Sequence, residues 1–116
     1  MRSKLLKFRE CIDKELYYEA HEVLEEIWFP KRFEDDAEVK LLKGFINSAV
    51  CFELIKRGRI EQSKKVWANY LKYRQLIYKI NSTNKKDLYS LSRYVEKHYK
   101  KLTTFLLFDS TIAKNF

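Results

Sequence analysis

Glycine and proline are nearly missing from this sequence, which has two glycines and one proline among 116 residues. An all-β fold needs many tight turns, and those turns depend on Gly and Pro, so their scarcity argues against such a fold. The apolar fraction of 46% and the aromatic fraction of 16% are sufficient for a packed core and argue against a disordered chain. The composition therefore predicts one all-α domain over residues 1–116, built as an antiparallel bundle of four to five helices.

Long apolar runs are also missing, and so are cysteines at the spacing of a metal site. No stretch approaches the roughly 20 apolar residues of a membrane span, and residues 1–10 are too charged for a secretory signal. Cys11 and Cys51 have no basic residue or His next to them in the sequence, so we interpret them as reduced packing residues. We therefore expect a cytoplasmic protein with no membrane partner.

Positive charge is unevenly distributed along the chain. The net charge is +8, yet residues 1–30 are net −2, whereas residues 59–116 hold thirteen Lys or Arg and four Asp or Glu, net +9. The basic C-terminal helices expected over residues 60–105 carry two stripes, which comprise Lys65, Lys72 and Lys79, and then Arg93, Lys97, Lys100 and Lys101 with Tyr94 and Tyr99 interleaved. Such a surface would attract nucleic acid, because each phosphate that a Lys or Arg side chain neutralises releases its bound counterions. Enrichment in Lys, Ile, Tyr and Asn is also what an AT-rich genome produces, and no recognition signature is present, so nucleic acid is an alternative partner and not the favoured one.

Apolar residues recur at helical spacing in five stretches. Residues 3–13 and 16–28 predict two helices, and Lys14 and Glu15 mark either a turn or a change of face. Residues 60–79 predict one helix with Ile60, Trp67, Leu71 and Ile77 pointing inward and Val66, Tyr70 and Tyr78 at its flanks. In the last expected helix, residues suited to pack against a neighbouring helix recur at alternating intervals of three and four positions. This seam consists of Leu88, Leu91, Val95, His98, Leu102 and Phe105. Residues 106–116 are left unassigned.

The helix expected over residues 37–57 is apolar on nearly every side. Asp35 or Asp36 is suited to cap its first turn, and Gly58 is suited to end it. A helix with so little polar surface must be packed on several sides, so we place it at the centre of the bundle. Gly44 and Ser48 lie one turn apart and would allow a neighbouring helix to approach closely.

Functional groups are densest between Tyr17 and Trp28. On a helix, His21, Glu25 and Trp28 share one side, and Glu19, Glu22 and Glu26 form a neighbouring acidic row. The second polar cluster is Lys43 and Asn47, one turn apart on the central helix. We therefore expect the side with His21, Glu25 and Trp28 to pack against the side with Lys43 and Asn47, and so to form a polar pocket lined by Glu19, His21, Glu22, Glu25, Trp28, Lys43 and Asn47.

Three interpretations of the His21 cluster remain open. In the first, His21 hydrogen-bonds Glu25 or a backbone carbonyl and only supports the fold. In the second, the cluster is a binding site for a small molecule or a protein partner. In the third, a divalent metal is held by His21, Glu25 and Glu53, with Glu22 as general base, because His-Glu-x-x-Glu resembles the His-Glu-x-x-His helix of zinc proteases.

The run from Tyr18 to Trp28, YEAHEVLEEIW, resembles the signature of the domain of unknown function 309 family. Lys43-Gly44-Phe45-Ile46-Asn47 resembles the family's second motif, Gly58 also fits, and the resemblance covers about residues 8–75. It implies a small helical bundle from a bacterium or another prokaryote, with no established activity. It also implies a shared site at the signature positions His21, Glu22, Glu25, Trp28, Lys43 and Asn47. The chain departs from the family where Glu53 stands near a frequent His, Arg59 replaces a common Asn, and Lys14 and Glu15 stand near a frequent Gly.

Together these observations favour a binding module over an enzyme. No cofactor is favoured, and a divalent metal is the alternative. The competing functions are a metal-dependent enzyme and a basic nucleic-acid-associated protein.

Overall fold

The computed structural model describes the backbone of residues 1–114 and the side chains of residues 1–104. Five α-helices follow one another, and two short 3-10 turns, Phe29–Lys31 and Gln75–Lys79, continue the second and fourth of them. The helices are α1 (Arg2–Asp13), α2 (Tyr17–Trp28), α3 (Ala37–Lys56), α4 (Ile60–Arg74) and α5 (Lys85–Lys114). No strand occurs in these residues, which confirms the all-α prediction.

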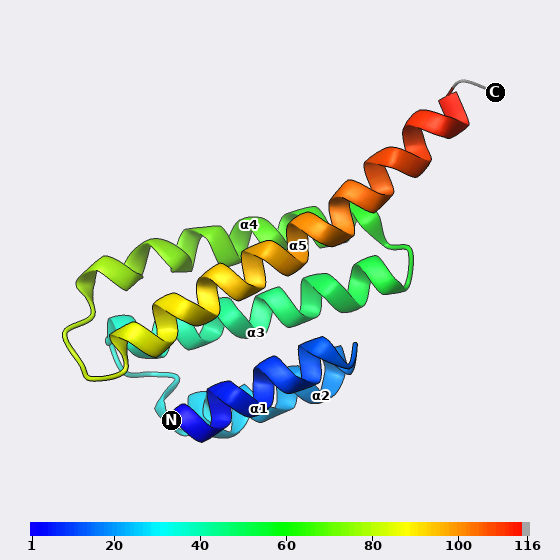
Figure 1. Cartoon of the computed structure of the whole chain (residues 1–116). Helices are drawn as coiled ribbons and strands as arrows, with labels where there is room; N and C mark the ends of the chain where they lie inside the picture. Colours follow the sequence, from blue (N-terminus) through cyan, green and yellow to red (C-terminus); the bar gives the residue numbers. More distant parts are fainter. Residues whose placement is uncertain (115–116) are drawn as a thin grey trace.

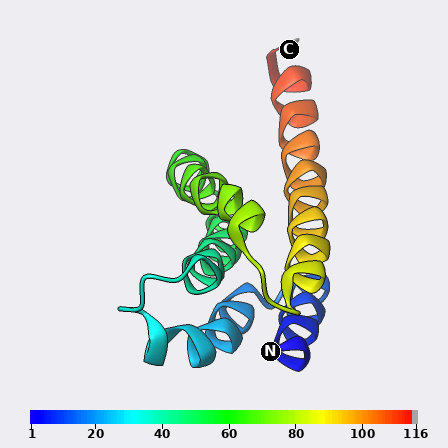
Figure 2. The same cartoon turned by 90° about the vertical axis from the view of Figure 1, so that its left-hand side faces the viewer.

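The bundle consists of two helical hairpins and a long final helix. Helices α1 and α2 form one hairpin, α3 and α4 form the other, and α5 runs back across them (Figure 1). Turning the molecule shows α5 beside α1, with α3 between α2 and α4 (Figure 2). Helix α3 packs against α2, α4 and α5, so the prediction that the apolar helix lies at the centre is confirmed.

The ends of the helices are set by local backbone chemistry. The Lys14–Glu15 segment is a turn, because Glu15 adopts a φ of 58° and the Leu16 N–H donates to the Cys11 carbonyl at 2.8 Å. At the start of α3, the Asp36 carboxylate accepts hydrogen bonds from the backbone N–H groups of the residues two and three positions on. Gly58 follows the end of α3 with a φ of 76°, the left-handed conformation that a residue without Cβ adopts most easily.

The fourth helix differs from the prediction in its end and in its inward face. The α-helix ends at Arg74, and residues 75–79 continue as a 3-10 turn. Trp67 and Ile77 are buried as expected, but Leu71 is 42% exposed while Tyr70 is fully buried. Tyr70 takes the inward position because its ring packs against Phe45 and its hydroxyl lies 2.9 Å from a carboxylate oxygen on α5. Leu71 has no comparable partner and faces solvent.

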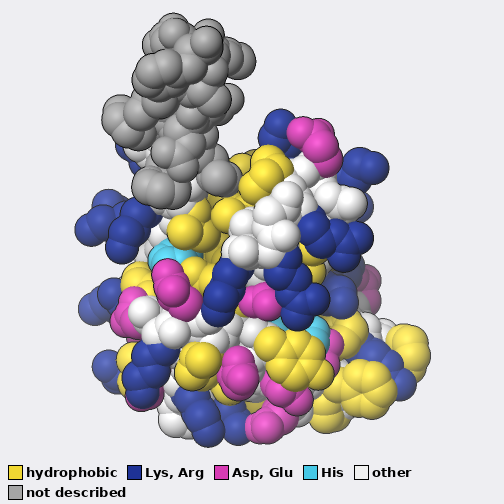
Figure 3. All heavy atoms as spheres, turned by 90° about the vertical axis from the view of Figure 1, so that its right-hand side faces the viewer, with side chains coloured by type: hydrophobic (Ala, Val, Ile, Leu, Met, Phe, Trp, Pro, Cys, Tyr) yellow, Lys and Arg dark blue, Asp and Glu magenta, His cyan; other side chains and the backbone are white. Residues whose placement is uncertain are grey.

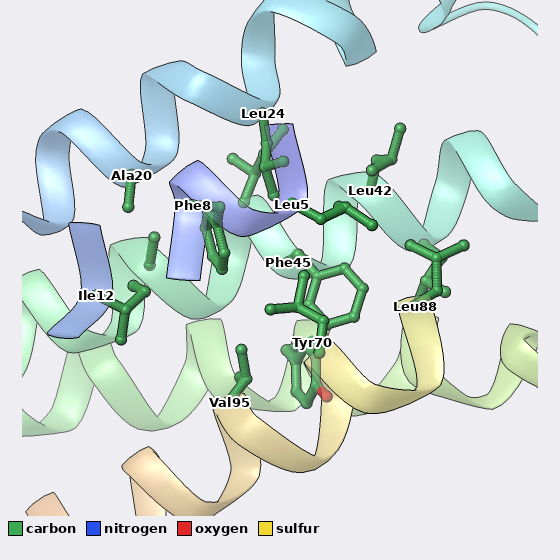
Figure 4. Close-up of a cluster of buried hydrophobic side chains, with 14 of the residues drawn as sticks. Leu5, Phe8, Ile12, Ala20, Leu24, Leu42, Phe45, Tyr70, Leu88 and Val95 are labelled. Carbon is green, nitrogen blue, oxygen red and sulfur yellow. The ribbon is translucent and has the colours of Figure 1, made fainter. Parts of the chain in front are cut away.

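A continuous apolar core joins all five helices (Figure 4). Phe8 of α1 meets Phe45 of α3, and the Trp67 ring of α4 stacks on Tyr99 of α5 at a centroid distance of 3.8 Å. Burying each large apolar side chain contributes about 1.5–3 kcal/mol. The labelled core residues are Leu5, Phe8, Ile12, Ala20, Leu24, Leu42, Phe45, Tyr70, Leu88 and Val95.

The long helix α5 follows the predicted seam as far as its side chains are described. Leu88, Leu91 and Val95 are buried, and Leu102 is partly buried against the core. The backbone of residues 106–114 continues α5, whereas the side chain of Phe105 and the last two residues lie outside the described part. No helix within the described residues is long and apolar enough to cross a membrane.

Replacing Gly44 with Ala tests how closely α3 and α4 approach. A Cβ at Gly44 would lie 2.8 Å from the Tyr73 Cβ, which cannot move without its backbone. We expect Gly44→Ala to lower the free energy of unfolding by about 1–3 kcal/mol, because overpacking outweighs the roughly 1 kcal/mol gain in helix propensity. Urea unfolding measures this change. Ser48→Ala is the matched control, since Ser already has a Cβ, and an unchanged or more stable Gly44→Ala protein would contradict the close approach.

Candidate functional site

Helix α2 holds its polar residues at the edge of the core because the adjoining side of the helix is buried. Tyr17, Ala20 and Leu24 are at most 2% exposed, and this packing fixes the rotation of the helix. His21 and Glu25 therefore lie at the boundary between core and solvent, with side chains 23% and 39% exposed. Glu19, Glu22 and Glu26, which form the acidic row, are exposed.

His21 and Glu25 form a half-buried pair one helical turn apart. The His21 Nε2 lies 2.9 Å from the Glu25 carboxylate, which can only accept, so Nε2 carries a proton. The other ring nitrogen, Nδ1, is buried and has no hydrogen-bond partner among the described residues. In the neutral imidazole, Nδ1 is therefore an acceptor without a donor.

Trp28 joins this edge of α2 to α3. The Lys43 ammonium lies 4.4 Å from the centroid of the Trp28 ring, a cation–π contact between the two helices. The Asn47 amide donates instead to the Lys43 carbonyl at 2.9 Å, within α3. One contact of the expected network is present, and the side-chain donor of Asn47 is used inside its own helix.

The alternative metal site is not formed. Within the described residues, no three His, Cys, Asp or Glu side chains are grouped so that they could hold an ion. Glu53 is paired instead with Arg57 at 3.0 Å, one turn along α3. The trio of His21, Glu25 and Glu53, which the sequence left open as an alternative, is therefore not brought together in the described part of the chain.

The two cysteines agree with a packing role. Both are free, Cys51 is buried, and Cys11 is partly buried. Burial raises the pKa of the Cys51 thiol to about 12 and also raises the pKa of the Cys11 thiol. Neither cysteine therefore has the lowered thiol pKa that typifies a nucleophile.

His98 forms a second histidine cluster with Tyr17. The Tyr17 hydroxyl lies 2.8 Å from the His98 Nε2, and the His98 ring meets Phe52 edge-on at 4.8 Å. Burial raises the pKa of Tyr17 to about 12, so its phenol keeps its proton at neutral pH. Burial, followed by the charge of Lys101, lowers the pKa of His98, although Glu15 and Asp13 act in the opposite direction.

A further hollow lies between α1 and α5, beside the second basic stripe noted in the sequence. It is a cavity of about 690 Å³ lined by Arg9 and Asp13 of α1 and by one side of α5 between Ser90 and Lys101. The regular spacing of Arg93, Lys97 and Lys101 was visible in the sequence. The contribution of α1 depends on tertiary packing, and no local signal predicted it.

The fold and its polar edge define a class of small helical-bundle protein that presents a half-buried His–Glu pair beside a Trp–Lys contact. The family described as Domain of unknown function (DUF309) matches residues 5–66, more than half of the chain, and the chain belongs to this family. The matched region contains most of α1, all of α2 and α3 and the first part of α4, and so includes both signature clusters. No curated protein and no solved structure matches the chain.

His98 gives a pH dependence that can be tested. Because its pKa in the folded protein is lowered from 6.5, the unfolded chain binds a proton more readily, and acidification below about pH 6.5 favours unfolding. We expect stability to rise with pH across the window from the folded pKa to 6.5, and we expect His98→Gln to remove that component. Urea unfolding of both proteins at about pH 5 and pH 7 measures it.

His21→Gln is the matched control, since it leaves His98 and its surroundings in place. An equal pH dependence in the parent and in His98→Gln would show that His98 is not the group responsible.

Proposed function

We propose that this protein is a binding module and that its ligand site is the polar face of α2 and α3. His21, Glu25, Trp28 and Lys43 form the centre of this face, with Glu19, Glu22 and Asn47 around them. The ligand is a small molecule or a protein segment that brings hydrogen-bond donors. The observation that carries the proposal is the buried Nδ1 of His21, which has no partner among the described residues.

A histidine kept only for the fold normally has both ring nitrogens satisfied. Here one nitrogen is paired to Glu25 and the other is not, although the residue lies at the edge of the core. The terminal torsion of His is broad and roughly two-fold, and a half-turn of the ring would exchange Nδ1 with Cδ2 and release the Glu25 carboxylate from Nε2. A ligand donor would then find two acceptors together, Nδ1 and the Glu25 carboxylate.

The Trp28–Lys43 contact supports the same ligand chemistry. Lys43 is half-buried and its long side chain covers the Trp28 ring without a described ion-pair partner. A ligand with a cationic or planar group would replace this ammonium on the ring and keep the cation–π energy. The acidic row on α2 favours such a cation electrostatically. Amines and guanidines are cations that carry hydrogen-bond donors, so they have the chemistry that this site would bind.

The test is an NMR titration of the ¹⁵N-labelled protein with agmatine, a small amine–guanidine, and with glutarate as the probe of opposite charge. We expect agmatine, and not glutarate, to shift the Trp28 indole N–H signal and the backbone amides around His21 and Lys43. His21→Ala and Glu25→Gln remove these shifts. Glu61→Gln is the matched control, because Glu61 forms an ordinary surface pair with Lys64.

Stability separates the binding role of His21 from a structural one. If His21 serves binding, His21→Ala changes the free energy of unfolding by less than about 1 kcal/mol, since Nδ1 has no bond to lose and Glu25 is reached by water. A loss of about 1–3 kcal/mol would assign His21 to the fold instead. The proposed site would be contradicted if agmatine did not shift these NMR signals, or if it shifted them equally in His21→Ala.

A further inference from the structure

A row of positive charge lines the groove between α1 and α5. Arg93, Lys97 and Lys101 are exposed and recur every four residues on one side of α5, and Arg9 of α1 lines the same groove. Figure 2 shows α1 and α5 lying side by side. In the space-filling view, Lys and Arg side chains lie along the left edge with Asp and Glu side chains among them (Figure 3).

The four cations of this groove are not neutralised by ion pairs with any side chain that the structure describes. Like charges four residues apart on a helix repel each other. An anion placed between α1 and α5 would remove that repulsion.

Asp13, the acidic residue among the described side chains that line the groove, is already engaged. The Asp13 carboxylate accepts a hydrogen bond from the Tyr94 hydroxyl, and this bond, after burial, raises the pKa of Tyr94. The Arg9 guanidinium lies over the Tyr94 ring at 4.3 Å from its centroid. This stacking holds Arg9 in place at the groove, where its planar fork of N–H groups suits a phosphate.

His98 adds a neutral donor to the same groove. Its Nε2 lies 2.8 Å from the Tyr17 hydroxyl, while no described residue hydrogen-bonds its Nδ1. When the Tyr17 phenol donates to Nε2, the proton of the neutral imidazole resides on Nδ1. That N–H group is then available to a phosphate oxygen.

We propose that the groove between α1 and α5 binds a small ligand that carries two or more linked phosphate groups, as a nucleoside di- or triphosphate or an inorganic polyphosphate does. Successive cations on α5 are about 6 Å apart and the row spans about 12 Å, so it matches a short chain of phosphates. A volume of about 690 Å³ is in the range of small-molecule sites. A long nucleic-acid strand would extend past this short row, which is why the small ligand is favoured.

The experiment is calorimetric titration of the full chain with tripolyphosphate, orthophosphate, ATP and a twenty-nucleotide oligo-dT, together with NMR mapping. We expect tripolyphosphate and ATP to bind, orthophosphate to bind at least about tenfold more weakly, and the shifted amides to lie in α1 and α5. Arg93→Ala/Lys97→Ala should weaken tripolyphosphate binding at least about tenfold, because two charged hydrogen-bond donors are lost.

Lys65→Ala/Lys72→Ala is the matched control, since it removes the same charge from exposed positions on α4. Equal weakening in both double variants would show unspecific attraction and overturn the proposal, as would binding of the oligo-dT alone. Circular dichroism confirms that both variants are folded. The amine site on α2 and α3 uses other residues and other probes, so either proposal can fail without the other.

Discussion

The absence of a polar face on α3 is the constraint on which the rest of the structure depends. A twenty-residue helix with apolar side chains on nearly every side is stable in water only when neighbours cover it. Helices α2, α4 and α5 provide that cover, and Gly44 lets α4 approach to the point where a Cβ would meet Tyr73. The two hairpins and the crossing of α5 follow from the need to bury this one helix.

The same constraint decides where polar chemistry is found. Lys43, Asn47 and Glu53 are half-buried at the margins of α3, and each meets a neighbour there. Helix α2 buries Ala20 and Leu24 against the core and so carries His21 to the edge. Two separate polar regions result, the His–Glu edge between α2 and α3 and the basic groove between α1 and α5.

Much of the fold could be predicted from the sequence because its signals are local. The Asp36 cap, the end of α3 at Gly58 and the central position of α3 depend on residues within one helix. The family could also be recognised, since its two motifs lie in short continuous runs. The sequence could not show that Tyr70, and not Leu71, faces inward on α4. Tyr70 is the buried residue because Glu96 on α5 supplies the partner for its hydroxyl.

The candidate sites were less predictable for the same physical reason. His21 and Glu25 lie one turn apart, so their pairing follows from helical geometry. Glu53 was considered only as the third ligand of an alternative metal site, and its observed partner is Arg57, one turn away. The groove depends on Arg9 and Asp13 lying against a helix from the other end of the chain, and spacing within either helix contains no information about that contact.

Native-state amide hydrogen exchange tests the central role of α3 most directly. If the other helices are arranged to bury α3, the amides between Leu41 and Phe52 should exchange only by global unfolding and be the slowest in the protein. The amides of α1 should exchange through local opening, with a lower opening free energy than those of α3. Amides in α3 that exchange through local opening, while α1 or α5 retains the greatest protection, would contradict this account.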